Sequence, residues 1–403
     1  MFKKILTVVL TGALALSMTG CKGALNLIGN STQSSNQSGD SAFNMYDEEV
    51  ENKVEEINEY IDTYFYFETD EEAQEEAIYD GIMAGLNDPY SVYYTAEEYA
   101  DLMEENSGEY VGVGAVVTQG ADKAVTIVRP IPGSPAEEVG LKAEDIVVQV
   151  GDVEILDQDL ATVVDMIRGE EGTEVYIRIY RPSINDYVEF NVTRRVVENV
   201  TVTAEILDGN IGYIQVQQFY ENTDEEFIAA VKDMESKGVK GIIIDMRDNP
   251  GGLLTSVVNM CDYIMDEGPI LTTKDKNGTI ISQYDSTDEE SVDIPMVVLV
   301  NGNSASASEI FAGALKDTGK AEIVGTTTFG KGIVQSILPL SDGTAIKLTV
   351  AKYFTPAGHD IHELGIEPDY VVELPDGMTS AVSLEKEKDT QLDKAIEIIY
   401  QLN

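Results

Sequence analysis

The chain has 403 residues, of which 43% are hydrophobic, so it is long enough for two or three domains with sizeable cores. It carries 73 acidic and 26 basic residues, which gives a formal net charge of −47 at pH 7. A surface of that sign repels a phosphate backbone and argues against nucleic-acid binding.

The first twenty residues have the organisation of an export signal. Lys3 and Lys4 precede an apolar stretch, residues 5–18, that is shorter than a bilayer span. The stretch ends in Met18-Thr-Gly-Cys21, which resembles a bacterial lipobox. We therefore expect a signal peptide over residues 1–20 and a lipid on Cys21, which would anchor the protein in the bacterial cell envelope, on the outer face of the cytoplasmic membrane. An ordinary secretory signal beside a chance cysteine is the alternative.

A tether and a helical region are expected next. Residues 21–44 are rich in Ser, Asn, Gln and Gly, a composition typical of flexible linkers. Residues 45–106 are acidic, with Val50, Val54 and Ile57 at helical spacing and a turn at 87–90. This pattern predicts a small helical domain or a pair of arms.

Residues 107–197 have the pattern of one compact, mostly β module. Turn residues separate β-rich runs at 111–118, 125–129, 146–150, 175–181 and 188–193, and short helices fit 134–138 and 159–167. The module opens with Tyr110, Val111, Gly112, Val113 and Gly114. A glycine loop before an exposed strand can bind a peptide carboxylate through backbone N–H groups while the peptide adds to the sheet. The alternative is a small barrel that serves only as a spacer.

Strands and helices alternate over residues 198–375, which predicts a layered α/β domain. Strands are expected at 212–219, 241–246, 296–300, 321–324, 333–339 and 345–353, and helices at 223–236, 253–265 and 306–316. The polar insert 274–293 indicates an exposed hairpin or loop. Residues 376–403 form a C-terminal segment that ends in an amphipathic helix.

Ser306 is a candidate nucleophile. It follows a buried strand and opens a helix, where free backbone N–H groups such as that of Ala307 could stabilise an oxyanion. The stretch from Ser306 to Glu309 is also a capping box, so this serine could only cap the helix. Ser304 and Ser308 are rival nucleophiles by composition.

Lys331 is the candidate base in a chain with only two histidines. A serine hydroxyl needs a partner that takes its proton, and burial can lower the pKa of a lysine far enough for that role. Lys331 lies between Gly330 and Gly332 and precedes an apolar strand. Gln335 could orient Lys331 only if the glycines let the chain curl, because an extended strand would separate the two residues by about 13 Å. A solvated surface lysine is the alternative.

Other motifs suggest different chemistry. Gly325 to Lys331 fits the opening of a phosphate-binding loop, but a glycine follows where Ser or Thr would bind magnesium. His359 and His362 form too small a cluster for a metal site, although a Ser-His-Asp triad with either of them stays open. Asp245-Met-Arg-Asp-Asn-Pro-Gly-Gly252 indicates a strand-to-helix turn with a structural Asp–Arg pair. No metal or cofactor is expected.

In their order along the chain, these motifs resemble those of the carboxy-terminal processing peptidases, also called tail-specific proteases. The resemblance runs from about residue 46 to the end and includes the motifs at 85–91, 133–137, 355–358 and 365–369. It implies a multi-domain α/β protein: a crotonase- or Clp-protease-like layered core, a PDZ domain inserted at 107–197 and an N-terminal helical region. A crotonase-type acyl-CoA enzyme would fit the core but not the export signal.

The same resemblance implies a serine endopeptidase and roles for single residues. Ser306 would be the nucleophile, Lys331 the base and Gln335 its orienting residue, with the N–H groups of Gly252 and Ala307 as oxyanion hole. Residues 110–114 would bind the apolar C-terminal tails of protein substrates, and Arg168 would couple the PDZ domain to catalysis. Residues 45–106 would serve as a dimer arm, and an activating partner is conceivable. A catalytically silent PDZ adaptor that only binds peptides is the alternative.

Overall fold

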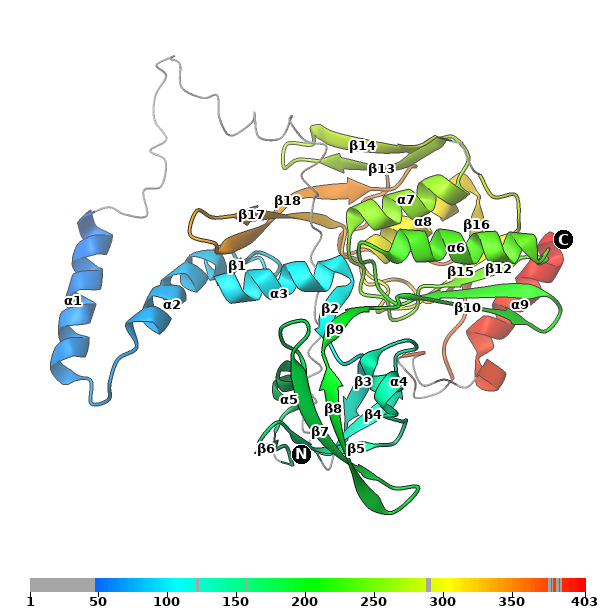
Figure 1. Cartoon of the computed structure of the whole chain (residues 1–403). Coiled ribbons are helices and arrows are strands. Elements are labelled where there is room, and N and C mark those ends of the chain that lie inside the picture. The colour runs from blue at the N-terminus through cyan, green and yellow to red at the C-terminus, as the bar shows by residue number, and fades with distance from the viewer. Residues whose placement is uncertain are drawn as a thin grey trace, which may run out of the picture.

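The computed structural model describes residues 48–120, 123–156, 158–287, 291–375, 378, 380, 381, 384 and 386–403. The expected signal peptide, Cys21 and the tether lie outside these residues. Figure 1 shows three parts: a helical arm, a small β-rich body and a larger layered α/β body.

A six-stranded sheet forms the centre of the layered body, in the order β10-β11-β12-β15-β16-β19. Its strands are β10 (Val202–Leu207), β11 (Ile211–Val216), β12 (Ile242–Asp245), β15 (Met296–Val300), β16 (Ala321–Gly325) and β19 (Tyr370–Val371). All are parallel except β10, which pairs with β11 in the antiparallel sense. Parallel strands covered on both faces need apolar residues in succession, which explains the uninterrupted apolar runs of β12 and β15.

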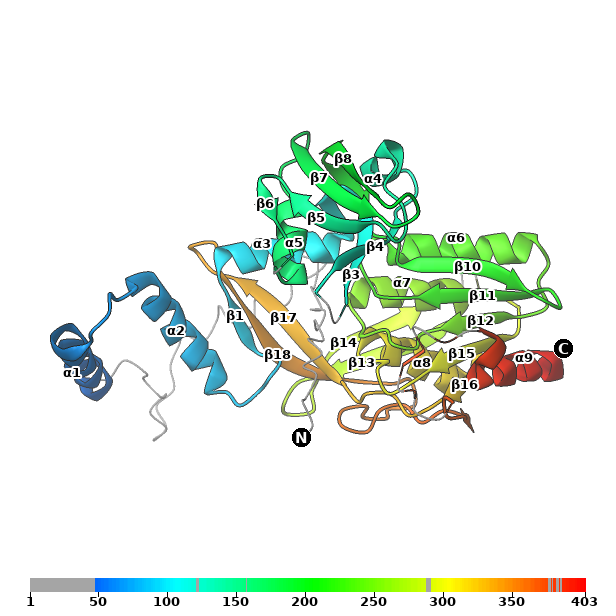
Figure 2. The same ribbon diagram turned by 90° about the horizontal axis from the view of Figure 1, so that it is seen from below.

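Helices cover both faces of this sheet. The helices α6 (Thr223–Ser236), α7 (Leu254–Ile264) and α8 (Ala307–Thr318) pack on one face, and α9 (Thr390–Leu402) packs on the other, beside β15 and β16 (Figure 2). Because side chains alternate along a strand, Ile242 and Ile244 join the first core and Ile243 the second. The layered domain therefore has three layers and two cores.

A second sheet is built around β18 (Ala345–Phe354). β17 (Ile333–Pro339) pairs along one edge of β18, while β1 (Val92–Tyr94) and β13 (Gly268–Lys274) share the other edge. β14 (Ile280–Ser286) completes a hairpin with β13 inside the polar insert. The sequence did not predict β1, which ties the N-terminal region to the layered body.

The β-rich body contains β3 (Ala115–Gln119), β4 (Val125–Pro130), β5 (Ile146–Val150), β6 (Val153–Glu154), β7 (Glu174–Arg181), β8 (Asp186–Thr193), α4 (Pro135–Val139) and α5 (Leu160–Ile167). The single strand expected at 111–118 is broken at Gly114, whose φ is +76°. A Cβ at that position would lie 2.3 Å from the Cβ of Ser134. The first half becomes β2 (Glu109–Gly112), which pairs with β9 (Arg195–Glu198) and leads toward the layered body.

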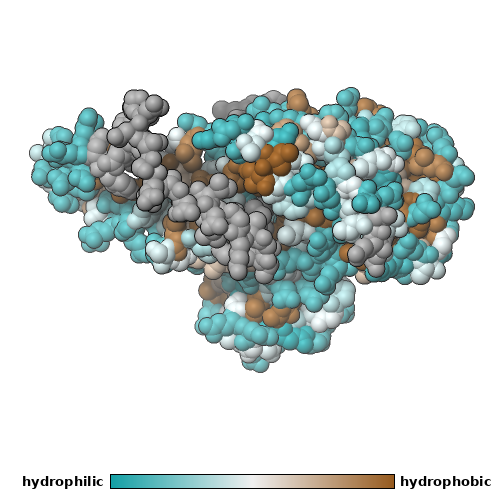
Figure 3. All heavy atoms as spheres, turned by 90° about the horizontal axis from the view of Figure 1, so that it is seen from above, coloured by the Kyte–Doolittle hydropathy of each residue, from teal (hydrophilic) through white to brown (hydrophobic). Residues whose placement is uncertain are grey.

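The helical arm consists of α1 (Glu48–Tyr64), α2 (Glu71–Ala84) and α3 (Ala96–Ser107). α1 buries none of its residues and projects from the rest of the molecule. On the face shown in Figure 3 the arm is mostly hydrophilic, and apolar residues lie in separate patches over the body. Within the described part of the chain, none of the helices combines the length and apolar character that a bilayer crossing requires.

Candidate active site

Ser306 lies in the turn between β15 and α8, at the carboxyl end of a central strand. Its φ of +53° and ψ of −113° are rare for a residue other than glycine and require support from the surrounding structure. The Glu309 carboxylate accepts the Ser306 N–H at 2.9 Å, as in a capping box. The Ser306 hydroxyl is buried and has no hydrogen-bond partner among the described residues. Because the hydroxyl does not cap the helix, it remains available for chemistry.

The two rival serines are engaged. The Ser304 hydroxyl donates to the carbonyl of Met246 at 2.8 Å, and the Ser308 hydroxyl donates to the carbonyl of Asn249 at 3.0 Å. Both hydroxyls fasten the Ser306 turn to the loop after β12. Of the three serines, only Ser306 has an uncommitted hydroxyl.

Lys331 is buried, with 4% of its surface exposed. Its Nζ lies 4.8 Å from the centre of the Tyr90 ring and forms no ion pair with a described carboxylate. Burial, and next the positive charge of Lys347, lower the pKa of Lys331 to about 8, against the attraction of Glu309 and Asp88. An amine with that pKa can take a proton near neutral pH.

Glu309 holds the segments of Ser306 and Lys331 together. Its Oε2 accepts the N–H of Ser306 at 2.9 Å and that of Lys331 at 2.8 Å. Its Oε1 accepts the Gly330 N–H at 2.7 Å and the Thr328 hydroxyl at 2.6 Å. Burial raises the pKa of Glu309 and these four hydrogen bonds oppose the rise. Sequence reasoning gave Glu309 only the role of a capping partner and missed this clamp.

Gln335 lies near the start of β17 and is 1% exposed. Lys331 lies two residues before the start of this strand. The pairing of β17 with β18 shifts register between Val334 and Gln335. The Gln335 Nε2 is buried without a hydrogen-bond partner among the described residues. This amide is therefore a second uncommitted polar group of the site.

The loop after β12 lies against Ser306. A Cβ on Gly251 would lie 2.8 Å from the Cβ of Ser306, so only glycine permits this approach. Asn249 fixes the loop, since its side chain accepts the Gly251 N–H at 2.9 Å and its carbonyl accepts the Ala305 N–H at 3.0 Å. The N–H groups of Gly252 and Ala307 donate no hydrogen bond to any described residue. Both donors are available to a ligand.

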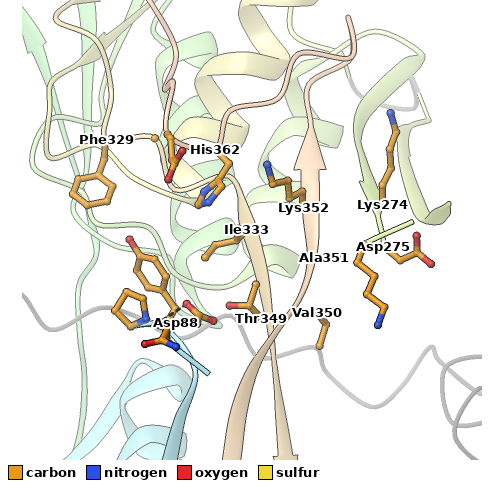
Figure 4. Close-up of a pocket in the computed structure, with 16 residues that line it drawn as sticks. Asp88, Lys274, Asp275, Phe329, Ile333, Thr349, Val350, Ala351, Lys352 and His362 are labelled. Carbon is orange, nitrogen blue, oxygen red and sulfur yellow. Dashed lines mark hydrogen bonds between the residues drawn. The ribbon is translucent and has the colours of Figure 1, made fainter. Parts of the chain in front are cut away.

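The lining of a cavity of about 810 Å³ includes Gly330, the chain neighbour of Lys331, but not Ser306, Lys331 or Gln335. Figure 4 shows Phe329, Ile333 and His362 toward one side of this cavity and Lys274 and Asp275 of the β13–β14 hairpin toward the other, with Thr349 to Lys352 of β18 between them. The Tyr90 ring belongs both to this cavity and to the surroundings of the Lys331 amine. The cavity is large enough for several residues of an extended peptide.

Neither histidine contacts Ser306. The His359 side chain is 71% exposed, with its Nδ1 3.6 Å from Asp317. His362 lines the cavity, and its buried Nδ1 has no hydrogen-bond partner among the described residues. Across the described ranges, no three His, Cys, Asp or Glu side chains gather in a way that could hold a metal ion.

The β-rich body has its own apolar groove of about 250 Å³. Four of the five residues expected to bind peptide line it: Tyr110, Gly112, Val113 and Gly114. Val111 does not line the groove and pairs with Val196 in the β2–β9 ribbon. The remaining lining residues are mostly apolar: Ala115, Val116, Val117, Ile131, Val164, Ile167, Arg168 and Asn199. The Arg168 guanidinium lies 5.2 Å from the centre of the Tyr110 ring, at one wall of this groove.

Comparisons with known proteins find a separate family match for the layered α/β body and for the β-rich body. Residues 210–372 match the model of peptidase family S41, and residues 126–181 match the model of the PDZ domain. The carboxy-terminal processing protease CtpA of Bacillus subtilis is 36% identical over 376 residues, which cover 93% of this chain and 77% of that protein. A carboxy-terminal-processing protease of Bartonella bacilliformis is 37% identical over 321 residues, or 77% of this chain and 72% of that protein.

Among solved structures, the photosystem II D1 C-terminal processing protease is 32% identical, with a TM-score of 0.48 and coverage of 79% of this chain and 87% of that one. The expected fold class is confirmed: a mixed α/β peptidase with an inserted PDZ domain. Because it is 36% identical to CtpA of Bacillus subtilis over 93% of its length and matches both family models, the chain belongs to peptidase family S41 and is a carboxy-terminal processing serine protease with a PDZ domain.

Proposed function

We propose that this protease cleaves peptide bonds with a Ser306–Lys331 dyad. One observation carries the proposal: the backbone N–H groups of Ser306 and Lys331 share one oxygen of Glu309. Among the described residues, the Lys331 amine forms no ion pair and the Ser306 hydroxyl has no hydrogen-bond partner. Buried polar groups are normally hydrogen-bonded, and exceptions gather at functional sites.

In this mechanism the neutral Lys331 amine takes the proton of the Ser306 hydroxyl, whose oxygen attacks the carbonyl carbon of the substrate. The N–H groups of Gly252 and Ala307 donate to the oxygen that becomes negative, where one such donor is worth roughly 3 kcal/mol. The Lys331 ammonium then gives its proton to the leaving amine. Water, activated by the same lysine, hydrolyses the acyl-enzyme.

Ser306 Oγ and Lys331 Nζ are not hydrogen-bonded to each other in the structure. Such contacts are often long without substrate and tighten in the complex. Gln335, with its uncommitted amide, would orient the amine as the two groups approach.

The PDZ groove would select the substrates. Its walls, which include Val113, Ile131 and Val164, favour an apolar C-terminal residue, and the N–H groups at the start of β3 would bind the terminal carboxylate. Arg168 contributes to the groove and contacts Tyr110, so it could report an occupied groove to the catalytic body.

Cys21 would carry a lipid that anchors the protease to the outer face of the cytoplasmic membrane. The residues from 45 to 106 would form a dimer arm. Four exposed aromatic side chains at the end of α1 and just after it are suited to such contacts: Tyr64, Phe65, Tyr66 and Phe67. Cys21→Ser should release the protein into the soluble fraction and abolish labelling with a fatty-acid analogue; unchanged membrane recovery and labelling would reject the anchor.

Lys331→Ala tests the dyad directly. Cleavage of an unfolded reporter with an apolar C-terminus should fall by a factor on the order of 10³ or more, because a general base supplies roughly 10²–10⁴. Binding of the free tail peptide, measured by fluorescence anisotropy, should stay unchanged. Ser306→Ala should behave alike, whereas Lys237→Ala, which removes an exposed lysine paired with Asp233, is the matched control.

Full turnover by Lys331→Ala would reject the dyad. If the wild-type protein bound tails but released no fragments, it would be a peptide-binding adaptor. For the wild-type enzyme, kcat/KM should rise as the pH passes about 8, the pKa of Lys331. A flat profile from acid to alkaline pH would contradict a lysine base.

A further inference from the structure

A second buried lysine lies in the middle of β18. Lys347 is 5% exposed and forms no ion pair with a described carboxylate. Its Nζ donates to the hydroxyl of Tyr94 at 2.6 Å and lies 5.2 Å from the centre of that ring. A buried ammonium without an ion pair is costly, and the mechanism above does not use this one.

Strand register places Lys347 diagonally across from Gln335. Along β17, Lys347 is opposite Ile337 and Thr349 is opposite Gln335. Residues two apart on a strand share a face, so Lys347 is the diagonal neighbour of Gln335, with Cα atoms about 7–8 Å apart.

The strand on the other edge of β18, β1, also connects Lys347 to the surroundings of Lys331. Lys347 is opposite Val92 of β1, and Tyr90, two residues earlier, lies against the Lys331 amine. The Ser91 hydroxyl accepts the Thr349 N–H at 3.1 Å and holds this segment against β18. Both strands that flank Lys347 therefore continue into the surroundings of Lys331.

Two groups on neighbouring elements act on the Lys347 amine, Tyr94 of β1 and Glu105 of α3, and Lys347 in turn acts on Lys331. Burial lowers the pKa of Lys347, while Glu105 favours its charged form. Burial, with the charges of Glu98 and Glu105, raises the pKa of Tyr94 to about 12, so its hydroxyl stays neutral and can accept from Lys347.

The charged groups around Lys331 differ from those around Lys347. Glu309 and Asp88 favour its ammonium, but each Glu309 oxygen is already engaged by two donors. Two amines that interact through their charges release their protons in steps, and the first proton leaves the amine with the weaker support. That amine is Lys331, because Lys347 has both a hydrogen bond to Tyr94 and the facing Glu105.

We propose that Lys347 is a positioning residue for the proposed dyad: a buried cation, held by Tyr94, whose charge keeps the neighbouring Lys331 amine free of a proton. A nearby cation is one of the ways in which a protein activates a lysine. Lys347 neither touches the substrate nor transfers a proton. The inference rests on the proposed function, since it matters only if Lys331 acts as the base.

Lys347→Met tests the inference, with Lys347→Arg as the variant that keeps the charge. The pH dependence of kcat/KM should separate them on a quenched fluorescent peptide. In Lys347→Met the acid limb should move up by about one pH unit, with about a tenfold loss at pH 7 and little loss on the alkaline plateau. Lys347→Arg should keep the acid limb within a few tenths of a unit. An unmoved limb, or an equal loss at every pH, would overturn the proposal.

A second measurement does not require Lys347→Met to fold. Lysine labelled with ¹³C at Cε reports each amine by NMR, with Lys331→Met and Lys347→Arg assigning the two resonances. Lys331 should titrate at lower pH than Lys347, and Lys347 should titrate at higher pH in Lys331→Met than in the wild type. The reverse order, or no shift in Lys331→Met, would overturn the proposal. Full turnover by Lys331→Ala would instead reject the Ser306–Lys331 dyad. A failure of the dyad can therefore be distinguished from a failure of the role proposed for Lys347.

Discussion

Two buried polar clusters lie at the carboxyl ends of adjacent parallel strands and differ in how completely they are paired. After β12, Arg247 bonds Asp245 at 2.6 Å and Asp389 at 2.8 Å, and Tyr213 donates to Asp245 at 2.6 Å. In the cluster around the turn after β15, the Ser306 hydroxyl and the Gln335 amide nitrogen of β17 have no partner in the described chain, and the Lys331 amine forms no ion pair with a described carboxylate.

The difference separates buried polar groups that stabilise the fold from buried polar groups that are left free to react. A buried charge is tolerated when partners satisfy it, and the first cluster also ties α9 to the sheet because Asp389 caps that helix. The second cluster leaves polar groups unpaired at a cost in stability, which proteins accept where the groups must react. Substitutions should therefore affect the two clusters in opposite directions.

Arg247→Met should have the largest effect on folding. It leaves the carboxylates of Asp245 and Asp389 buried without a counter-charge, which typically costs about 3–5 kcal/mol. Urea unfolding followed by circular dichroism measures the loss. The triple change Asp245→Asn, Arg247→Met and Asp389→Asn is the matched control and should recover part of it. A loss under about 1 kcal/mol in the single variant would contradict the view that these charges depend on each other.

Lys331→Met should instead stabilise the fold at pH 7. Because the pKa of Lys331 is about 8 in the folded protein, against about 10.5 unfolded, its ammonium disfavours folding below pH 8 by about 3 kcal/mol. Between pH 8 and 10.5 the unfolded chain binds more protons, so wild-type stability rises with pH and the advantage of the variant fades. Unfolding curves at pH 7 and pH 10.5 test both statements. Equal free energies of unfolding for the variant and the wild type at pH 7 would contradict a buried ammonium that disfavours folding.

The elements of the core follow from the sequence where the signal is local. The strand expected at 296–300 and the helix at 223–236 coincide with β15 and α6, because apolar runs and helical periodicity specify them without distant contacts. The structural Asp245–Arg247 pair was also predicted and is confirmed. Asp389, 142 residues from Arg247, has no sequence signal that links it to this pair.

The candidate site shows the same limit. Ser306 and Lys331 stand out by their glycine-rich and small-residue surroundings, but a lone lysine inside a strand, such as Lys347, looks like a solvated residue. Its burial depends on β1, whose Tyr94 lies 253 residues away along the chain. The position of Glu309 predicted a helix cap, and only the packing of its carboxylate against Gly330 and Lys331 gives it a second role.

Glu309→Gln should change the free energy of unfolding less than Arg247→Met or Lys331→Met does. It should lower both stability and activity. A carboxamide keeps one acceptor oxygen but presents an NH₂ group to two of the four donors, so unfolding should require about 2 kcal/mol less free energy. Activity should fall as well, because the Ser306 and Lys331 segments lose their shared anchor. The acyl-enzyme burst with an ester substrate distinguishes two causes of lost activity. Its amplitude reports the fraction of folded, active enzyme, and its rate reports whether Ser306 and Lys331 are correctly placed. Unchanged stability and turnover would mean that the clamp is not required.

His359→Gln should have the smallest effect. The imidazole is mostly exposed and lies 3.6 Å from Asp317, and exposed ion pairs contribute about 0–1 kcal/mol. We expect kcat/KM within about twofold of the wild type and unfolding within about 0.5 kcal/mol. His362→Gln is the stricter companion, because His362 lines the cavity and could change KM through substrate contact. A loss of kcat on the order of 10² or more in either variant would bring a histidine into the mechanism and remove the need for an amine of lowered pKa.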